Sequence, residues 1–172
     1  MRSGTEATEL ETCPGCRLQR PSLDGATDPY GGASASCWAL FGEVCAKNYG
    51  EFRDPDVQQL IVDAYMAQHP AFATPAGRRS VAVHLVGLYC SIEESSPSRE
   101  VIRTIATVFP TKRDVLPFEP IPSLGELDIA FVHAAEDREE RGARANLWAR
   151  AVWRAWAAHH ARVRRLRRGE EP

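Results

Sequence analysis

The cysteine pair in Cys13-Pro14-Gly15-Cys16 constrains the fold of this chain more than any other feature of its sequence. Two thiolates separated by two residues, with a glycine that permits a tight turn, can converge on one cation. They supply only half of a tetrahedral zinc site, and the sequence has no second Cys-x-x-Cys. We therefore expect the fold to bring the other ligands to this knuckle from five histidines and three cysteines: His69, His84, His133, His159, His160, Cys37, Cys45 and Cys90.

Length and composition indicate one domain with an ordinary core. A chain of 172 residues encloses such a core without disulfides, whereas two domains of half that length would each be marginal. Residues 1–12 are polar and expected to be disordered, residues 13–168 form the single domain, and residues 169–172 are a tail. Charged residues make up 26% of the chain and apolar residues 44%, which is typical of a globular protein.

The sequence also predicts a cytoplasmic location. No apolar run approaches the roughly 20 residues that a membrane span needs, and the N-terminus lacks the hydrophobic stretch of a secretory signal. In a reducing compartment five cysteines, an odd number, are more naturally metal ligands or buried thiols than disulfide partners.

Apolar residues recur at the spacing of one helix face in about five to six segments, which predicts an all-α helical bundle with the knuckle in an N-terminal loop. The second segment has clear ends, with Asp54 as N-cap and His69 before a proline as the stop. A capping box of Ser123 and Glu126 predicts the start of the fifth helix, and Gly142 is expected to separate it from the last one. The expected helices cover about 37–50, 54–69, 79–94, 96–110, 123–134 and 143–168.

His84 has the most clearly defined surroundings of the five histidines. It falls among Val81, Leu85 and Leu88 on one stripe of the third expected helix, so its imidazole points inward and needs a polar partner. It is either a metal ligand or a core histidine bonded to Asp63, which lies at the same level if the second and third helices are antiparallel neighbours. A carboxylate in that position also orients a metal-bound histidine.

Three other histidines are candidate ligands. His69 ends the second helix, where its ring either caps exposed carbonyls or turns toward the knuckle. His159 lies on the apolar face of the last helix and His160 on its flank, and each can complete a metal site or bond a backbone carbonyl. His133 is expected on the surface.

The cysteines outside the knuckle carry weaker signals. Cys37 opens a helix, where the positive end of the dipole favours a ligand or a reactive thiolate. The alternative for Cys37 is a small buried apolar group, and Cys45 and Cys90 are expected in the core.

A series of short motifs spans about residues 13–163. These are Cys13-Pro-Gly-Cys16, Asp28-Pro-Tyr30, Ser36-Cys37-Trp38, Asp63-Ala-Tyr65 with Gln68-His69-Pro70, Val83-His84-Leu85, and Trp153-x-x-Trp156-x-x-His159-His160. Together they resemble a family of small bacterial proteins known as a domain of unknown function. The resemblance implies no activity. It implies that the knuckle, the end of the second helix and the tandem histidines belong to one recurring constellation.

The sequence therefore predicts a small helical metal-binding protein of unknown activity. Zinc is the expected ion, because sulfur and imidazole ligands suit it better than they suit hard cations. The expected ligands are Cys13, Cys16, His69 and one of His84, His159 or His160. The metal is expected to tie the N-terminal loop to the bundle, and it is needed either for folding or for shaping a pocket.

A metal-dependent enzyme is the main alternative. A site with three protein ligands leaves one position open for water and a small-molecule substrate. Asp63, Tyr65 and Glu43 can then supply a base or an orienting group, since Glu43 precedes apolar positions of the first helix. The sequence has no glycine-rich phosphate loop, nucleophile elbow or His-Glu-x-x-His motif, so nucleotide binding, serine hydrolysis and that type of peptidase lack support.

The arginine-rich end of the chain gives a further alternative, a nucleic-acid-binding or regulatory module. Seven arginines and no acidic residue lie between Arg150 and Arg168. The whole chain nevertheless has a formal net charge of −2, unlike a dedicated nucleic-acid binder. A solvated helix end whose arginines favour the dipole explains the pattern without nucleic acid. The oligomeric state stays open.

Overall fold

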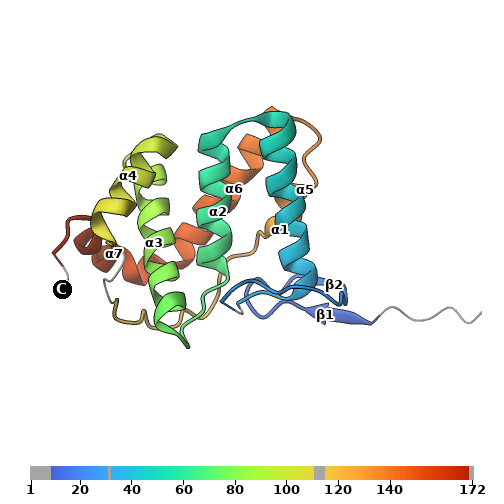
Figure 1. The fold of residues 1–172 in the computed structure, drawn as a ribbon, viewed down its shortest axis with the longest axis horizontal. Coiled ribbons are helices and arrows are strands. Elements are labelled where there is room, and N and C mark those ends of the chain that lie inside the picture. The colour runs from blue at the N-terminus through green and yellow to red at the C-terminus, as the bar shows by residue number, and fades with distance from the viewer. Residues whose placement is uncertain (1–8, 31, 111–114, 171–172) are drawn as a thin grey trace, which may run out of the picture.

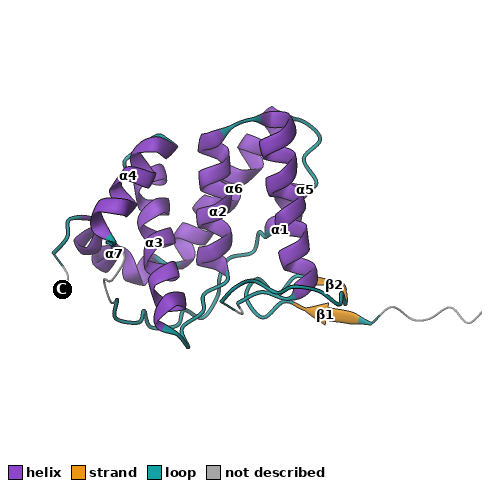
Figure 2. Ribbon diagram, in the orientation of Figure 1, coloured by secondary structure: helices purple, strands orange, loops and turns teal. Residues whose placement is uncertain are grey.

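The computed structural model describes residues 9–30, 32–110 and 115–170. In this part of the chain seven α-helices form a bundle, which confirms the all-α prediction, and a two-stranded sheet lies at its base beside the knuckle (Figure 1, Figure 2). The helices are α1 (Ala35–Lys47), α2 (Pro55–Gln68), α3 (Pro75–Ile92), α4 (Ser98–Val108), α5 (Ile129–His133), α6 (Arg138–Ala155) and α7 (His160–Arg167). None of these helices is long and apolar enough to cross a membrane.

Helix α2 lies at the centre of the bundle, packed against α3 and α6. Its inward face is buried around Tyr65, which has no exposed surface. Two buried tryptophans from the last third of the chain hold its C-terminal end. Trp148 Nε1 donates to the side-chain oxygen of Gln68 at 3.0 Å, and Trp156 Nε1 donates to the carbonyl of Ala67 at 3.1 Å. The last turn of α2 is therefore fixed in position by the bundle.

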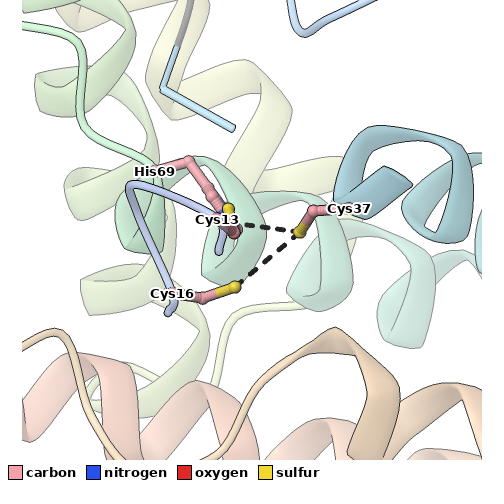
Figure 3. Close-up of side chains that lie close together, drawn as sticks. All are labelled: Cys13, Cys16, Cys37 and His69. Carbon is pink, nitrogen blue, oxygen red and sulfur yellow. Dashed lines mark hydrogen bonds between the residues drawn. The ribbon is translucent and has the colours of Figure 1, made fainter. Parts of the chain in front are cut away.

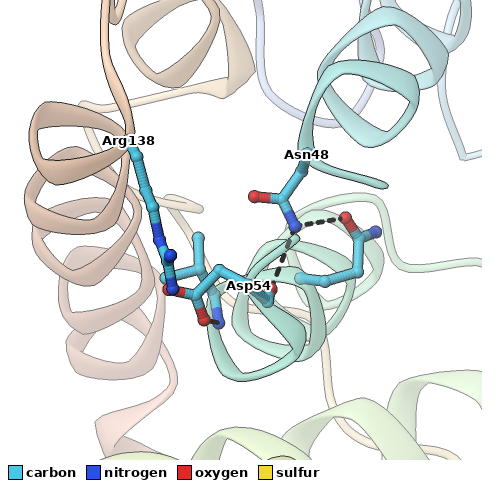
Figure 4. Close-up of polar contacts among 5 residues, drawn as sticks. Asn48, Asp54 and Arg138 are labelled. Atoms are coloured by element: carbon cyan, nitrogen blue, oxygen red, sulfur yellow. Dashed lines mark hydrogen bonds and ion pairs between the residues drawn. The ribbon is translucent and has the colours of Figure 1, made fainter. Parts of the chain in front are cut away.

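The N-terminal end of α2 is fixed by Asp54, as its capping pattern predicts (Figure 4). One carboxylate oxygen accepts from the N–H of Val57 at 3.1 Å, and the other pairs with Arg138 on α6 at 3.1 Å. The carbonyl of Asp54 accepts from Asn48 Nδ2 at 3.0 Å. Asn48 begins the π-helical turn Asn48–Phe52 that follows α1, so one capping residue joins three elements.

Two helices begin where the sequence pattern did not place them. Helix α3 starts four residues early, because the Thr74 hydroxyl accepts from the N–H of Gly77 at 3.0 Å and caps it. The capping box at Ser123 is wrong: its hydroxyl accepts from Gly125 at 3.4 Å within a loop, and Gly125 has a φ of 98°. Asp128 caps the short α5 instead.

The C-terminal part of the bundle also differs from the prediction. Gly142 does not separate two helices, because it lies inside α6. The single last helix is instead interrupted after Ala155 at Trp156, and a 3-10 turn, Ala157–His159, leads into α7. This break rotates the residues that follow it out of the register that a continuous helix would give them.

The small sheet lies in a region expected to lack regular structure. Strands β1 (Leu10–Thr12) and β2 (Gln19–Pro21) pair antiparallel, with Glu11 opposite Arg20. Three residues a strand are too few for an alternating pattern to be recognised. Of the segment predicted to be disordered, residues 1–8 lie outside the described residues and residues 10–12 form β1. Residues 171–172 of the expected tail also lie outside.

Candidate metal centre

Three separate segments bring four metal-ligating side chains together. Cys13 and Cys16 come from the knuckle, Cys37 from the first turn of α1, and His69 from the residue after α2 (Figure 3). Their sulfur and imidazole nitrogen atoms all lie within 4.8 Å of one another. Three of the four residues are buried, and Cys16 is partly exposed. These four residues, called the Cys3His cluster below, lie close enough to bind one metal ion.

Backbone hydrogen bonds close the knuckle into a tight turn. The N–H of Arg17 donates to the carbonyl of Cys13 at 3.0 Å, and the N–H of Cys13 donates to the carbonyl of Leu18 at 2.9 Å. Arg17 adopts a φ of 67°, a left-handed conformation that few residues other than glycine favour. The turn directs both sulfurs of the pair toward the bundle.

Two glycines allow the N-terminal loop to pack directly on His69. A Cβ added to Gly15 would overlap the His69 ring and would lie only 2.9 Å from the carbonyl oxygen of Gln68. A Cβ added to Gly32 would overlap the backbone carbonyl of His69. The glycine of the knuckle therefore serves the approach to the imidazole as well as the turn.

Cys37 is positioned by the cap of its own helix. Ser34 is the N-cap of α1, and its hydroxyl accepts from the N–H of Cys37 at 3.3 Å. The loop before the cap is held by the buried carboxylate of Asp28, which accepts from the N–H groups of Tyr30 at 2.9 Å and Ala33 at 2.6 Å. The Cys37 sulfur thus points from the first turn of α1 into the cluster.

The hydrogen bond of His69 fixes its tautomer. Its Nδ1 lies 2.7 Å from the carbonyl oxygen of Tyr65. A carbonyl only accepts, so Nδ1 carries the proton and Nε2 keeps its lone pair. This Nε2 lies 3.5 Å from the sulfur of Cys37. A neutral imidazole held in this way is the form that ligates a metal.

Two distances within the cluster match the edges of a zinc tetrahedron. With Zn–S bonds of about 2.3 Å and a Zn–N bond of about 2.0–2.1 Å, two sulfurs would be about 3.8 Å apart and sulfur and nitrogen about 3.6 Å apart. The sulfurs of Cys16 and Cys37 are 3.7 Å apart, and the Cys37–His69 distance is 3.5 Å. All five cysteines are free thiols, so no disulfide accounts for this spacing.

The three thiols share their protons unequally. Hydrogen bonds from Cys16 and Cys37 lower the pKa of Cys13 well below its ordinary value, which favours its thiolate form. The hydrogen bond to Cys13 raises the pKa of Cys16 far above its ordinary value and raises the pKa of Cys37 to about 12. A divalent cation would reverse this, because a coordinating thiol is deprotonated outright.

Tyr65 supports the cluster from inside the bundle. Its hydroxyl donates to the sulfur of Cys37 at 3.6 Å, and its ring stacks on Phe41 and on His69 with centroids 4.0 Å apart in each case. Burial raises the pKa of Tyr65 above its ordinary value. This hydroxyl is therefore a hydrogen-bond donor to Cys37, and the orienting role of Tyr65 at a metal stays a prediction.

The structure places His84 and Asp63 in a separate pair. His84 Nδ1 lies 2.8 Å from the carboxylate of Asp63, as one of the two sequence alternatives predicts, and His84 is not part of the cluster. Asp63 is fully buried and also accepts from Gln59 at 3.0 Å. Burial raises the pKa of Asp63, although its hydrogen bond to His84 lowers it in part. The pair links α2 to α3.

The tandem histidines also lie outside the cluster. His160 stacks on Trp153 with centroids 3.7 Å apart, and its Nε2 donates to the carbonyl of Trp153 at 2.9 Å. His159 contacts the rings of Phe118 and Trp156. The tandem histidines do not reach the cluster because the helix breaks at Trp156. After this break they no longer follow the periodicity of α6.

Glu43, which was expected near the metal, and His133, which was expected on the surface, form an exposed pair. Glu43 does not face inward: its side chain is 62% exposed and pairs with His133 at 3.0 Å. The surface position of His133 agrees with the prediction. Glu43 therefore cannot serve as a base at the cluster.

Cys37 is the member of the Cys3His cluster that the sequence indicated only weakly. A single cysteine has no spacing pattern, and a buried thiol in a first helical turn is usually a small apolar group. Gly15 and Gly32 allow the loop to approach His69 closely, but this role is evident only from the structure, so no local sequence signal identifies Cys37. Cys90 is fully buried as expected, and Cys45 is only partly buried, accepting from Gln58 at 3.2 Å.

Comparison with known proteins gives one match. A family model described as a family of unknown function (DUF5946) matches residues 11–157. This range holds all four residues of the Cys3His cluster, and the match confirms the resemblance of the sequence motifs to a domain of unknown function. No curated protein and no solved structure matches the chain significantly.

Proposed function

The chain belongs to this family of unknown function, and we propose that it is a zinc protein in which Cys13, Cys16, Cys37 and His69 bind one Zn²⁺. The observation that carries the proposal is the agreement of two measured distances, 3.7 Å between sulfurs and 3.5 Å between sulfur and nitrogen, with the edges of a zinc tetrahedron. The orientation of His69, whose Nε2 faces the sulfurs, also supports the proposal.

The donor set favours zinc over other ions. Three sulfurs and one imidazole nitrogen are soft or borderline ligands, whereas magnesium and calcium require oxygen. Three thiolates also compensate the charge of a divalent ion, and the hydroxyl of Tyr65 donates to one of the three sulfurs. Reduced cysteines in this arrangement are consistent with the cytoplasm, which we propose as the compartment.

The proposed role of the zinc is structural. Four protein ligands close the tetrahedron, so no position is left for water or substrate. The ion would cross-link the knuckle, the start of α1 and the end of α2. The N-terminal loop contains one small sheet and few buried apolar side chains, and it therefore depends on such a link. A catalytic site with three ligands is less well supported, because Glu43 lies away from the cluster and Asp63 is engaged by His84.

Metal content and cobalt spectroscopy test this function. Protein purified with a reductant should contain one zinc per chain, and exchange into Co²⁺ should give the thiolate-to-cobalt charge-transfer bands of a tetrahedral sulfur-rich site. Cys37→Ser should lose the ion or weaken those bands. Cys90→Ser is the matched control, because Cys90 is also fully buried but lies outside the cluster. A wild-type protein without metal, or a Cys37→Ser protein with full zinc and unchanged spectra, would reject the proposal.

A further inference from the structure

A second candidate site lies at the end of α2 opposite the cluster. It is a cavity of about 380 Å³ between α2, α6 and the connection from α3 to α4. Asp56 lines it from the first turn of α2, whereas His69 follows the last turn, so the two sites are about 20 Å apart along the helix. The volume lies within the range of about 300–1,000 Å³ that small-ligand pockets occupy.

Ser95 lines this cavity in a backbone conformation that serine does not favour. Its φ is 54°, in the left-handed region where glycine has no steric cost. The turn allows the N–H of Ser96 to bond the carbonyl of Cys90 at 2.9 Å. Glycine would make the same turn without strain. The chain instead has a serine at this position, and Ser95 lines the cavity.

Gly142 is an unfavourable residue on the facing wall. Glycine inside a helix is less stable than alanine, and Gly142 lies within α6. A Cβ there would meet only Val57 Cγ2 at 3.5 Å, an ordinary contact. Gly87 in α3 differs, because a Cβ on Gly87 would overlap the carboxylate of Asp63. Packing requires Gly87 but not Gly142. The missing side chain at Gly142 does keep the cavity open.

The polar groups around the cavity are varied and their charges balance. Asn146 and Arg150 follow Gly142 at four-residue intervals, so all three lie on one face of α6. Arg150 Nε donates to Asn146 Oδ1 at 2.7 Å, which leaves the amide N–H groups of Asn146 to donate to a ligand. Asp56 uses one oxygen to accept from the N–H of Ser98 at 2.7 Å, and its other oxygen is an acceptor.

We propose that this cavity binds a small neutral polyhydroxylated molecule, a monosaccharide or cyclitol. Four serines line the cavity, and their hydroxyls, with the amide of Asn146, both donate and accept. One carboxylate and one guanidinium leave no net charge to attract an anion or a cation. The apolar side chains of Val57 and Leu60 contribute surface for the C–H face of a sugar ring. Two locally costly residues, Ser95 and Gly142, both line the cavity, as expected where a functional site overrides local preference.

The test measures stability and binding in the same variants. Full-length metal-loaded protein is titrated with D-glucose and with myo-inositol at millimolar concentrations and followed by saturation-transfer NMR. Ser95→Gly and Gly142→Ala should each raise the melting temperature, because each removes a local backbone cost. Each should also weaken the binding of the probe, by roughly tenfold for the lost Ser95 hydroxyl. Asn146→Ala tests a direct hydrogen bond from the Asn146 amide to the probe. We expect this variant to fold normally.

Two matched variants separate the effect on ligand binding from the effect of relieving an unfavourable backbone conformation. Arg53→Gly relieves another left-handed residue, with a φ of 51°, and Gly42→Ala fills an exposed position in α1 where nothing lies within 4 Å. Both should raise the melting temperature and leave binding unchanged. The proposal is overturned if neither probe binds wild-type protein, or if Ser95→Gly and Gly142→Ala bind it unchanged. Tighter binding of glucose 6-phosphate or of glycine would replace the neutral ligand with an anion or a zwitterion.

Discussion

Two inward-facing histidines, His69 at the end of α2 and His84 on α3, make similar hydrogen bonds through Nδ1. They differ in what surrounds the other ring nitrogen. Both His69 and His84 use Nδ1 to bond an oxygen on α2, at 2.7 and 2.8 Å. The partner of His69 is the neutral carbonyl of Tyr65, and its Nε2 faces three sulfurs. The partner of His84 is the buried carboxylate of Asp63, and the His84 side chain is 18% exposed. Surroundings at the second nitrogen, rather than burial alone, distinguish a metal ligand from a structural pair.

Removing His69 should give the largest effect. His69→Ala deletes one side chain of the Cys3His cluster and the ring that Gly15 packs on, so we expect loss of zinc and upward of about 4 kcal/mol of stability. Hydrogen exchange should become fast in the segment from Cys13 to Ser36, while the amides of α3 stay protected. Zinc content, urea unfolding and exchange mapping measure these outcomes. Retention of one zinc per chain in His69→Ala would contradict the proposed difference between His69 as a metal ligand and His84 as a member of a structural pair.

Replacing His84 should destabilise the protein without affecting the metal. His84→Leu leaves the carboxylate of Asp63 buried with only Gln59 as partner, which should cost about 3 kcal/mol. Zinc content should stay at one ion per chain. Changing both members of the pair, His84→Leu with Asp63→Leu, should cost less than the sum of the single changes, since neither partner is then left unsatisfied. An unchanged melting temperature in His84→Leu would show that the pair contributes nothing.

Crowding the approach to His69 should have a smaller effect. Gly32→Ala places a methyl group against the carbonyl of His69 and should cost about 2 kcal/mol, with weaker zinc affinity as the loop shifts. Gly50→Ala is the control, because nothing lies within 4 Å of the added carbon. Competition with a chelator of known affinity measures the change. Equal zinc affinity in both variants would contradict the close packing of the loop on the imidazole.

Local signals made much of the fold predictable. The N-cap at Asp54 and the stop at His69 depend on side chains within one turn of the helix end, so the sequence alone indicates them. The break at Trp156 could not be read in this way. Apolar spacing continues through it, and the interruption depends on how the tryptophan packs beneath α2. The sequence therefore did not predict the positions of His159 and His160, which follow the break.

The candidate site was predictable only where a residue carries a local sequence signal. Cys13 and Cys16 form a spacing pattern, and His69 stands at a helix end that can face the knuckle. Cys37 joins them through tertiary contact alone. Glu43 is on the same helix as Cys37, but the surface on which it lies depends on how α1 packs on α5, which no local pattern encodes.

The smallest expected effect distinguishes two aspartates of α2 by the sign of their pH dependence. Burial raises the pKa of Asp63 above 3.8, so above that pH the folded protein keeps a proton that the unfolded chain has released. Stability then falls as pH rises toward the raised pKa. The N–H of Ser98 lowers the pKa of Asp56 below 3.8, so its contribution is present above 3.8 and is lost as pH falls.

Urea unfolding of metal-loaded protein at a series of pH values checks this difference, with zinc content measured at each pH. Asp63→Asn keeps an oxygen for His84 Nδ1 and should remove a decline of stability with rising pH. Asp56→Asn should remove a loss of stability with falling pH. The two difference curves should therefore slope in opposite directions. If they slope in the same direction, His84 holds Asp63 ionised against the cost of burial. The second histidine would then be a charged member of an ion pair, which is a sharper contrast with the neutral imidazole of His69.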